Sequence, residues 1–410
     1  MSVFTPVSRL SWRQLVFPFS LVLFEFTTYI AHDMVQPGML LVTGEFGVGP
    51  EWVSASLTAY LMGGILLQWL LGPLSDKTGR RPVLLAGVAL FALACGLTHW
   101  AATIEQFVGL RFVQGISLCF IGAVGYAAIQ EAFDETRSVR IMALMANVAL
   151  LAPLVGPLAG AALLSVTSWR TMFWVFAALS VISFIGLWRA MPETAGDRQV
   201  SIRISSLARG YWRLLGDRQV LSGSLAIGLA AVPVLAWVAL APVILIHDQG
   251  MSRMDYALLQ LPVFLAMIGG NLTLSYLAGR VTIEQPLRFG AWPLCFGLLL
   301  VPLGLLTGSH QVLWLVTGLS IYAFGSGMVN AGLYRLTLFS SSEGKGLVAA
   351  LLGMLSILVF AVGIELAKFV WFNASMMGFS LVNLASGALW LVLVVGFLRE
   401  YARRSRVTPL

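Results

Sequence analysis

The sequence predicts an all-α polytopic membrane protein that crosses the bilayer twelve times, in two halves of six helices, with both termini in the cytoplasm. Of its 410 residues, 59% are apolar and 10% are charged, whereas about 25% of the residues in soluble domains are charged. The mean hydropathy is +0.88. Apolar runs of roughly 20 residues, enough to cross a bilayer as a helix, recur along the whole chain. These observations place the chain in a membrane.

Twelve apolar runs mark the expected transmembrane helices, with limits good to a few residues. The first six lie near Arg13–Val42, Trp52–Leu74, Pro82–Ala101, Glu105–Ala132, Ile141–Val166 and Arg170–Met191. The last six lie near Gln219–Ile246, Asp255–Ala278, Pro286–Leu306, Gln311–Phe339, Gly344–Phe372 and Met376–Leu398. The chain then divides into an N-terminal half (1–191), a cytoplasmic linker (192–218) and a C-terminal half (219–410), a layout typical of transporters built from repeated halves.

The positive charges support this orientation. With both termini inside, 21 of the 25 lysines and arginines fall in cytoplasmic segments, as the positive-inside rule requires. The net charge of +7 therefore reflects membrane topology, and we expect no nucleic-acid partner. In the linker, Leu207, Tyr211 and Trp212 alternate with Arg209 and Arg213, which predicts a helix lying along the cytoplasmic headgroups. The alternative is a linker that only covers the hinge between the halves.

The sequence carries no motif of an enzyme or a metal site. Cys95, Cys119 and Cys295 lie separately within apolar runs, so neither a disulfide framework nor a CxxC metal site is available. No HExxH, GxSxG or P-loop sequence occurs. Gly325 and Gly327 do not complete a dinucleotide fingerprint, and we expect them to serve close helix packing. We therefore expect no enzymatic activity, no metal and no cofactor.

Two carboxylates, Glu25 and Asp33, interrupt the first apolar run. A carboxylate at the centre of a membrane helix costs about 2.5–3.5 kcal/mol on insertion scales. Such acids must face other protein or water, and they are candidate sites for protons or cations by default. Steps of four residues place Glu25, Tyr29 and Asp33 on one slanting stripe of a helix.

The loop after the second span resembles motif A of the major facilitator superfamily, with Gly72, Asp76, Gly79, Arg80 and Arg81 at its defining positions. A loop that only supplies positive charge would explain the arginines but not their spacing from the aspartate and the glycines. The resemblance implies the two-half fold of that superfamily. It also implies a cytoplasmic gate, at which Asp76 anchors arginine side chains across the gate.

The fourth span resembles motif B of the same superfamily in the segment from Arg111 to Gly115, and that motif's buried arginine is associated with proton coupling. The alternative is an arginine that snorkels to the outer interface. Arg111 and Asp33 each lie about six residues from the outer end of their spans, roughly 9 Å deep. They can therefore share a layer and form a direct or water-bridged charge pair.

The fifth span resembles motif C, the antiporter signature of this superfamily, at Pro153, Gly156, Pro157 and Gly160. Ala152 and Ala161 replace two of the signature's glycines. The alternative is ordinary packing of small residues between helices. The match favours exchange of two substrates over their cotransport.

Longer segments resemble the multidrug/proton antiporters of the superfamily along nearly the full chain. In those proteins the two acids of the first span recognise protons and cationic drugs, which points here to Glu25 and Asp33. The resemblance implies a drug cavity between the halves. It makes the following residues candidate walls of that cavity: Tyr29, His32, Leu118, Met145, Leu235, Phe264 and Phe360. His32 stands where the family leads us to expect asparagine, and a titratable neighbour can alter the proton affinity of Asp33.

The expected function is that of a proton-coupled multidrug efflux antiporter in the bacterial inner membrane. It would work as a monomer and would export lipophilic cationic, zwitterionic and neutral compounds by alternating access, driven by the proton gradient alone. One alternative is a proton-coupled symporter of small molecules with the same fold. A more remote alternative is a membrane receptor or scaffold that transports nothing. Glu365 and Lys368, three residues apart in the eleventh span, predict an intrahelical ion pair.

Overall fold

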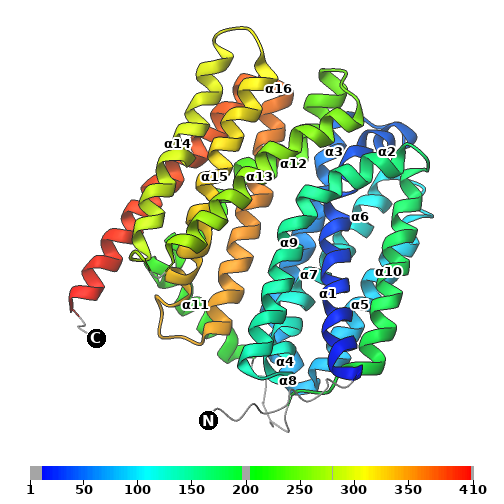
Figure 1. The fold of residues 1–410 in the computed structure, drawn as a ribbon, viewed down its shortest axis with the longest axis vertical. Helices are drawn as coiled ribbons and strands as arrows, with labels where there is room; N and C mark the ends of the chain where they lie inside the picture. Colours follow the sequence, from blue (N-terminus) through cyan, green and yellow to red (C-terminus); the bar gives the residue numbers. More distant parts are fainter. Residues whose placement is uncertain (1–11, 196–203, 279, 408–410) are drawn as a thin grey trace, which may run out of the picture.

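Helices form almost all of the protein in a computed structural model, which describes residues 12–195, 204–278 and 280–407 (Figure 1). The described residues contain one isolated bridge, between Ala278 and Val281, and no strand. The first half contains α1 (Trp12–Asp33), η1 (Gln36–Gly38), α2 (Met39–Glu45), η2 (Pro50–Trp52), α3 (Val53–Leu66), α4 (Gln68–Thr78), α5 (Arg80–Thr98), α6 (Ile104–Gly115), α7 (Ser117–Phe120), η3 (Ile121–Gly125), α8 (Tyr126–Ala132), α9 (Glu135–Leu164) and α10 (Trp169–Ala190). The rest of the chain contains α11 (Ile204–Gly216), α12 (Arg218–Ala241), η4 (Pro242–Asp248), α13 (Arg253–Leu277), α14 (Glu284–Leu305), α15 (Gln311–Leu338) and α16 (Lys345–Val407).

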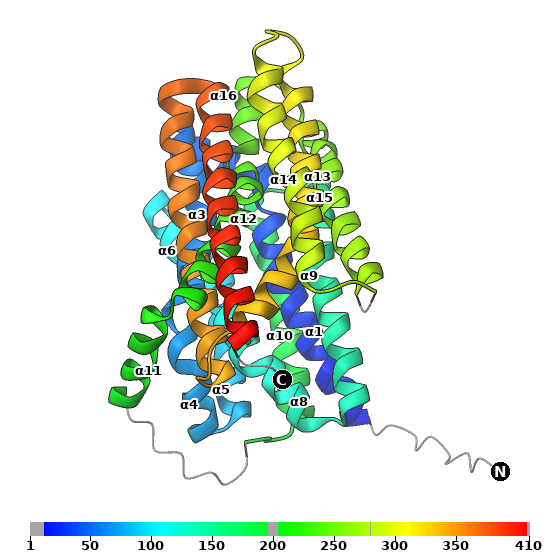
Figure 2. The ribbon, with the colours of Figure 1, turned by 90° about the vertical axis from the view of Figure 1, so that its left-hand side faces the viewer.

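The predicted spans correspond to these helices. Ten helical segments of the described chain are long and apolar enough to cross a membrane, and the bent pair α3–α4, with 44° between its parts, makes up to eleven. The 63-residue α16 is not one rod, because Ser375 inside it has φ 68° and ψ −165°. Figure 2 shows its orange and red parts running side by side. The predicted eleventh and twelfth spans lie on either side of that point.

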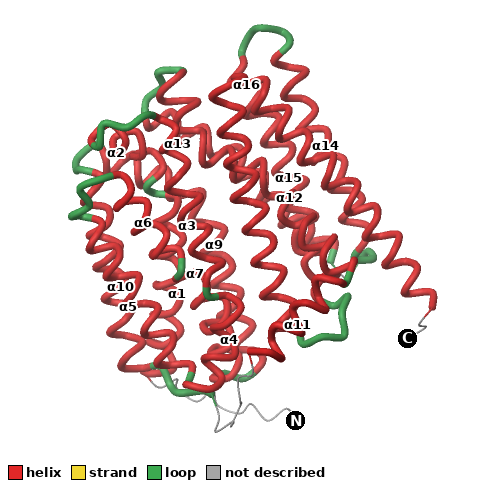
Figure 3. Tube along the Cα trace, turned by 180° about the vertical axis from the view of Figure 1, so that it is seen from behind, coloured by secondary structure: helices red, strands yellow, loops and turns green. Residues whose placement is uncertain are grey.

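The number of spans and their orientation stay predictions, because the structure contains no membrane. The first residues of α1 and the last residues of α16 lie toward the same end of the bundle (Figures 1 and 2). Figure 3 shows that most loops, drawn in green, gather at the two ends of the bundle. Both observations are compatible with an even number of spans.

The first span covers Gln14–Glu45, about the predicted range, but it is not one continuous α-helix. The prediction was one continuous helix to Val42, but α1 ends at Asp33 and the chain continues through η1 and α2. Pro37 explains the break, since a proline lacks the N–H that would bond the carbonyl four residues earlier, and its ring clashes with that carbonyl. That carbonyl belongs to Asp33, so the proline leaves this acid at the C-terminal end of a helix.

Two other spans differ from simple helices. The predicted fourth span is divided into α6, α7, the π-helical turn η3 and α8. The predicted fifth span begins six residues early, at Glu135, because the Asp134 side chain caps α9 by accepting a hydrogen bond from the Arg137 backbone N–H at 3.0 Å. A capping aspartate at this position stabilises the first turn of a helix.

Two large hydrophobic cores organise the bundle, and a small third one joins α11, α12 and α16. One is built almost entirely from residues of α1 to α10, and the other mainly from residues of α12 to α16. The two groups of helices meet where α9 packs against α13 and where α3 packs against α16. The predicted domain boundaries after residues 191 and 218 stay predictions.

Glycines bring helices of the second core into close contact. A Cβ built at Gly327 in α15 would lie 2.3 Å from the carbonyl oxygen of Met267 in α13. One built at Gly325 would lie 2.4 Å from the backbone nitrogen of Leu294 in α14. The prediction that these two glycines serve close helix packing is confirmed.

The predicted linker contains α11, and its residues 196–203 lie outside the described part. Figure 2 shows α11 beside the ends of α4 and of the orange part of α16. The Tyr211 hydroxyl donates to the Trp69 carbonyl of α4 at 3.3 Å. A helix is therefore present where one was predicted, while its position along the membrane headgroups stays a prediction.

Candidate functional site

Glu25 lies within α1 with its side chain fully buried. Its Oε1 accepts a hydrogen bond from the hydroxyl of Tyr126 at 3.0 Å. Tyr126 begins α8 directly after the π-helical turn η3, and such turns are frequent at functional sites. The second carboxyl oxygen, Oε2, is buried without a hydrogen-bond partner among the described residues. Because an unsatisfied buried acceptor costs about 1–3 kcal/mol, this oxygen is a natural acceptor for a proton or a cationic ligand.

Asp33 is the last residue of α1 and is 3% exposed. Its Oδ1 lies 2.9 Å from Nδ1 of His32. These two adjacent side chains form an ion pair only when the histidine is protonated. The C-terminal end of a helix carries a partial negative charge, which favours a positive charge beside this carboxyl group. The position is thus suited to a proton or a cation.

Helix α9 packs directly against the end of α1 through the glycines of the predicted antiporter motif. A Cβ built at Gly156 would lie 2.6 Å from the Cβ of Asp33. One built at Gly160 would lie 2.1 Å from the carbonyl oxygen of the residue after Asp33. Pro153 and Pro157 lie inside the same helix. The motif therefore brings the α9 backbone against the segment that carries Asp33.

Arg111 is fully buried in α6, so the alternative of an arginine snorkelling to the interface is wrong. Its Nε donates to the Ser56 hydroxyl at 3.1 Å, and its Nη1 donates to Gln114 Oε1 at 2.7 Å. The guanidinium carbon lies 4.6 Å from the ring centre of Tyr60, a cation–π contact worth about 0.5–2 kcal/mol. Nη2 has no hydrogen-bond partner among the described residues.

Close packing of α3 and α6 creates this environment. A Cβ built at Gly115 would lie 1.8 Å from the carbonyl oxygen of Tyr60, and one at Gly63 would lie 2.0 Å from that of Phe112. Only glycine permits such an approach of two backbones. The glycines therefore place Arg111 directly against the α3 face that carries Ser56 and Tyr60.

Asp33 and Arg111 form no direct ion pair in the described structure, so the expectation of a direct charge pair is wrong. Tyr60 links their surroundings instead. Its ring faces the Arg111 guanidinium on one side and lies 5.6 Å from the His32 ring. Its hydroxyl donates to the Thr28 carbonyl of α1 at 2.8 Å. The aromatic side chain thus packs against Arg111 and lies near His32, and a water-bridged pair stays a prediction.

The predicted cavity walls are distributed over both halves. Met145 is buried in the first core and Phe264 in the second. Leu235 and Phe360 are half-buried against the second core. Tyr29 and His32 are half-buried on α1, near the acids. Leu118 is also half-buried, and it lines a cavity between the halves.

The predicted gate motif forms a dense charge network. Arg80 pairs with Asp76 one turn earlier and with Glu131 of α8, where Nη2 and Oε1 are 3.0 Å apart. The Glu193 carboxylate accepts the Arg80 backbone N–H at 2.7 Å, which places a negative charge at the start of α5. Gly79 has φ +105°, a conformation that side-chain-bearing residues rarely adopt. The sequence alone gave no sign of Glu131 or Glu193.

This network lies within the first half rather than across the gate. Asp76 was expected to anchor arginines across the gate, but the arginine that it holds, Arg80, lies only four residues later in the same half. The guanidinium of Arg81 donates to the carbonyl of Trp188 in α10 at 2.5 Å. The Gly72 carbonyl accepts from Arg80 Nη1 at 3.4 Å. The motif therefore ties α4, α5, α8 and α10 into one unit.

A cavity of about 480 Å³ separates this unit from the C-terminal half. Asp76 and Leu118 line it on one side, Gly346 of α16 on the other, and Tyr211 of α11 beside them. Burial raises the pKa of Tyr211 to about 12, so this phenol is a neutral donor at physiological pH. The cavity thus joins the gate motif, one predicted wall residue and the linker helix.

A second contact joins the halves at the predicted outer end. The Thr58 hydroxyl of α3 donates to Glu365 Oε1 of α16 at 2.8 Å. Glu365 also pairs with Lys368 on its own helix, so the predicted intrahelical pair is confirmed. The contact with Thr58 could not be predicted, because its partners are 307 positions apart in sequence.

A family model described as the Major Facilitator Superfamily matches residues 21–364, most of the chain. The chain belongs to the major facilitator superfamily. Superfamily membership and the helical architecture indicate a transporter rather than an enzyme, and a multi-pass protein of the bacterial inner membrane. Among the described residues, no group of three or more His, Cys, Asp or Glu is arranged to hold a metal ion.

Curated relatives within the superfamily match almost the whole chain. Multidrug transporter MdfA of Yersinia pestis biovar Antiqua (strain Angola) is 55% identical over 397 residues, 97% of each chain. The protein of the same name from Edwardsiella ictaluri is 54% identical, and that of Escherichia coli O6:H1 is 53% identical, each over 96% of both chains. A crystal structure of a bacterial homologue of the human lysosomal transporter Spinster, inward-facing and unoccupied, superposes with a TM-score of 0.67. At 12% identity, over 94% of this chain and 96% of that one, this match supports the fold alone.

Proposed function

We propose that the protein is a proton-coupled multidrug efflux antiporter that works as a monomer and needs no cofactor beyond the proton gradient. It exports lipophilic cationic, zwitterionic and neutral compounds by alternating access. The observation that carries the proposal is the pair of buried carboxyl groups on α1, one with an unpartnered oxygen and one at the end of the helix. The relatives named multidrug transporters provide the substrate class.

Asp33 is the proposed site of the exchanged proton. It is buried, it lies at the negative end of the α1 dipole, and α9 packs on its backbone. Its neighbour His32 offers a second titratable group at 2.9 Å. Arg111 provides a fixed positive charge near this site. It acts through Tyr60, which packs against the Arg111 guanidinium and lies near the His32 ring. A carboxyl group there can hold a proton or neutralise a bound cation, but it does not serve both at once.

Glu25 is the proposed partner in cation recognition. Tyr126 fixes one of its oxygens and leaves the other unpartnered. A lipophilic cation near Glu25 would supply the missing positive charge in an environment of low dielectric constant, where such attraction is strong. The two acids lie on one stripe of α1, separated by about 12 Å along the helix axis. They can therefore act on one extended ligand or on two separate charges.

Broad specificity follows from the nature of the proposed walls. Tyr29, Leu118, Met145, Phe264 and Phe360 offer apolar and aromatic area without a fixed set of hydrogen bonds. Flexible methionine and aromatic surfaces repack around different ligands, so binding depends on area more than on shape. A neutral drug would compete with the proton indirectly, through the conformation that each favours.

The proton gradient provides the energy. Each proton that enters gains about 1.36 kcal/mol per pH unit and about 2.3 kcal/mol per 100 mV. Exchange of one proton for one monovalent cation is electroneutral and loses the voltage contribution. A second acid leaves room for a second proton, which would restore that contribution.

Alternating access requires that contacts between the halves break at one end and form at the other. At the predicted outer end, the hydrogen bond from Thr58 to Glu365 joins α3 to α16. At the predicted cytoplasmic end, Tyr211 of the linker helix bonds the Trp69 carbonyl. The network of Asp76 and Arg80 keeps the first half rigid, so the halves can move as units.

Flux in proteoliposomes tests the proposal. Vesicles with an acidic lumen receive tetraphenylphosphonium outside, and its accumulation inside is followed over time. An antiporter accumulates the cation as protons leave, whereas a symporter would expel it and a scaffold would do neither. Glu25→Gln should reduce uptake of this cation more than Glu51→Gln, a matched change at an exposed acid. Equal uptake by wild-type and empty vesicles would contradict the proposal.

A further inference from the structure

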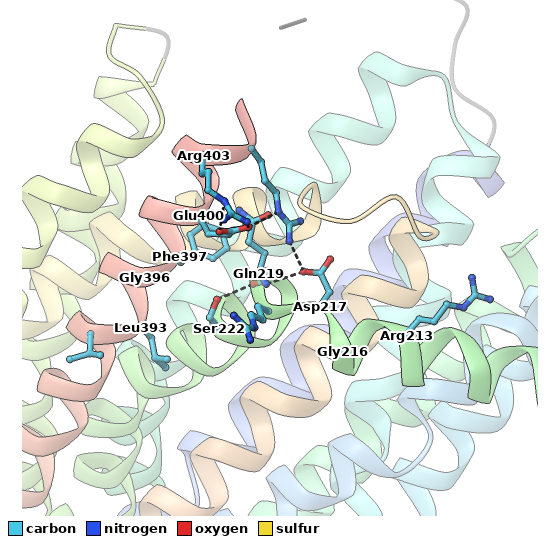
Figure 4. Close-up of a pocket in the computed structure, with 13 residues that line it drawn as sticks. Arg213, Gly216, Asp217, Gln219, Ser222, Leu393, Gly396, Phe397, Glu400 and Arg403 are labelled. Atoms are coloured by element: carbon cyan, nitrogen blue, oxygen red, sulfur yellow. Dashed lines mark hydrogen bonds and ion pairs between the residues drawn. The ribbon is translucent and has the colours of Figure 1, made fainter. Parts of the chain in front are cut away.

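A crevice at one end of the C-terminal half lies outside the proposed transport site. It has a volume of about 720 Å³ and lies between the first turns of α12 and the last turns of α16, beside the end of α11 (Figure 4). We refer to it as the α12–α16 crevice. Its charged lining residues are Arg213, Asp217, Arg218, Glu400, Arg403 and Arg404. Four arginines against two acids give the lining a net charge of +2.

Both acids of the crevice are already engaged. Asp217 caps α12 by accepting the Gln219 backbone N–H at 2.9 Å, and it also lies 3.5 Å from Arg404 Nη2. Glu400 pairs with Arg403 and with Arg404, each at 3.2 Å. The acids therefore have little capacity left to neutralise a further positive charge in the crevice.

The positive charge of Arg218 has no ion-pair partner among the described residues. Among the described residues, no hydrogen bond or ion pair engages its side chain, whereas Arg213 pairs with Glu343 at 2.9 Å. Arg218 is the first residue of α12, where the positive end of the helix dipole already favours an anion. A cation at this end of a helix is unfavourable, and the carboxylate of the preceding Asp217 is already engaged by the Gln219 N–H and by Arg404.

A buried donor points into the same place. Gln219 is 2% exposed and lines the crevice. Its Nε2 has no acceptor among the described residues. Figure 4 shows this side chain between the first turn of α12 and the helix that carries Glu400 and Arg403. Because leaving a buried donor unpaired is costly, the amide indicates an acceptor that the chain itself does not provide.

The crevice continues into an apolar surface. Val392 and Leu393 line it, and Val392 is 70% exposed. Leu389 and Val395 on the same part of α16 are also exposed, as expected for side chains that face lipid tails. A ligand that fits both parts carries an anionic group with several acceptor oxygens and an apolar body.

We propose that the α12–α16 crevice binds the phosphate of an anionic glycerophospholipid from the cytoplasmic leaflet. The phosphate accepts from Arg218, Gln219 and the arginines at the end of α16, and the acyl chains lie along Val392 and its exposed neighbours. The positive-inside distribution places this arginine-rich end in the leaflet that carries anionic lipids. The planar guanidinium group of arginine can donate two parallel hydrogen bonds to the oxygens of a phosphate. A free phosphate would use the polar part alone and leave the apolar wall uncovered.

Native mass spectrometry of the delipidated full chain tests the assignment. The protein is titrated with phosphatidylglycerol, with phosphatidylcholine of the same acyl chains, and with inorganic phosphate. Phosphatidylglycerol should bind more tightly than phosphatidylcholine. Arg218→Gln should weaken its binding about fivefold, the effect of one arginine near an anionic surface. Arg140→Gln, at an exposed arginine of the other half, is the matched control and should leave binding unchanged.

Three results would overturn the proposal. They are equal affinity for the two lipids, equal losses in Arg218→Gln and Arg140→Gln, and full displacement of phosphatidylglycerol by inorganic phosphate. The last result would assign the crevice to a free anion. Gln219→Leu serves as a second variant that removes the buried donor and keeps the charge, and it should weaken phosphatidylglycerol binding about tenfold. Arg218 is exposed, so an unchanged melting temperature is expected. Lipid binding is measured without transport. A failure of the lipid-binding proposal can therefore be distinguished from a failure of the proposed transport function.

Discussion

Replacing Gly156 by alanine tests how α9 positions the acid of α1. The added Cβ would lie 2.6 Å from the Cβ of Asp33 and 3.2 Å from its carbonyl carbon. Carbon atoms in contact prefer about 3.5–4.0 Å, so the two helices must separate by about 1 Å at this point. Overpacking of this kind costs about 1–3 kcal/mol. We therefore expect a less stable protein in which Asp33 is displaced from α9.

The assay combines two measurements on purified protein in detergent. The first is the apparent melting temperature, which should fall for Gly156→Ala. The second is proton release on addition of tetraphenylphosphonium, read with a pH dye, which should decrease. Gly96→Ala is the control, because nothing lies within 4 Å of a Cβ built there. If Gly156→Ala matched Gly96→Ala in both measurements, α9 would not constrain Asp33 and the packing argument would be refuted.

Three further predictions concern the gate contacts. Gly79→Ala should lower stability by about 1–3 kcal/mol, because alanine is strained at φ +105° and its Cβ would lie 2.4 Å from Glu193 Oε2; the apparent melting temperature measures this. Thr58→Val should remove the bond to Glu365 and shift the equilibrium toward an open outer end roughly twofold to tenfold; labelling of an outer-side cysteine measures the shift. Asp76→Asn should change labelling of a cytoplasmic-side cysteine by up to about fivefold, since the Asp76 carboxylate is partly exposed and a solvent-screened ion pair contributes at most about 1 kcal/mol.

Each of these variants has a control. Gly44→Ala adds a Cβ in open space and should not change the melting temperature. Thr273→Val removes a hydroxyl that bonds only its own helix and should not open the outer end. Glu135→Gln changes an exposed acid and should leave cytoplasmic labelling unchanged. A gate variant that behaves like its control would contradict the role given to that contact.

The sequence was sufficient to predict what depends on local composition. Apolar runs located most of the long helices, although some ends differ by six residues or more, and the glycine spacing near Gly325 indicated close packing. The break after Asp33 was missed because the run remains apolar beyond it. Pro37 was the available signal, since its effect falls on the carbonyl four residues earlier. Attention to that proline would have placed Asp33 at a helix end.

Contacts between distant segments could not be predicted in this way. Tyr60 packs against Arg111 and lies near His32 because Gly63 and Gly115 let α3 and α6 approach. The depth of a residue along its span does not reveal which side chains surround it. The Tyr126 bond to Glu25 depends on a π-helical turn, which no sequence pattern indicated. Such partners depend on how helices meet in three dimensions.

Proton release by the Asp33→Asn variant is the most direct measurement of drug–proton exchange. Purified wild-type protein in weakly buffered detergent solution, mixed with tetraphenylphosphonium and a pH dye, should release protons as the cation binds. Asp33→Asn should retain part of its tetraphenylphosphonium binding and lose this release, while Glu51→Gln, at an exposed acid, should release protons like the wild type. Undiminished release from Asp33→Asn would contradict the assignment of the exchanged proton to this residue.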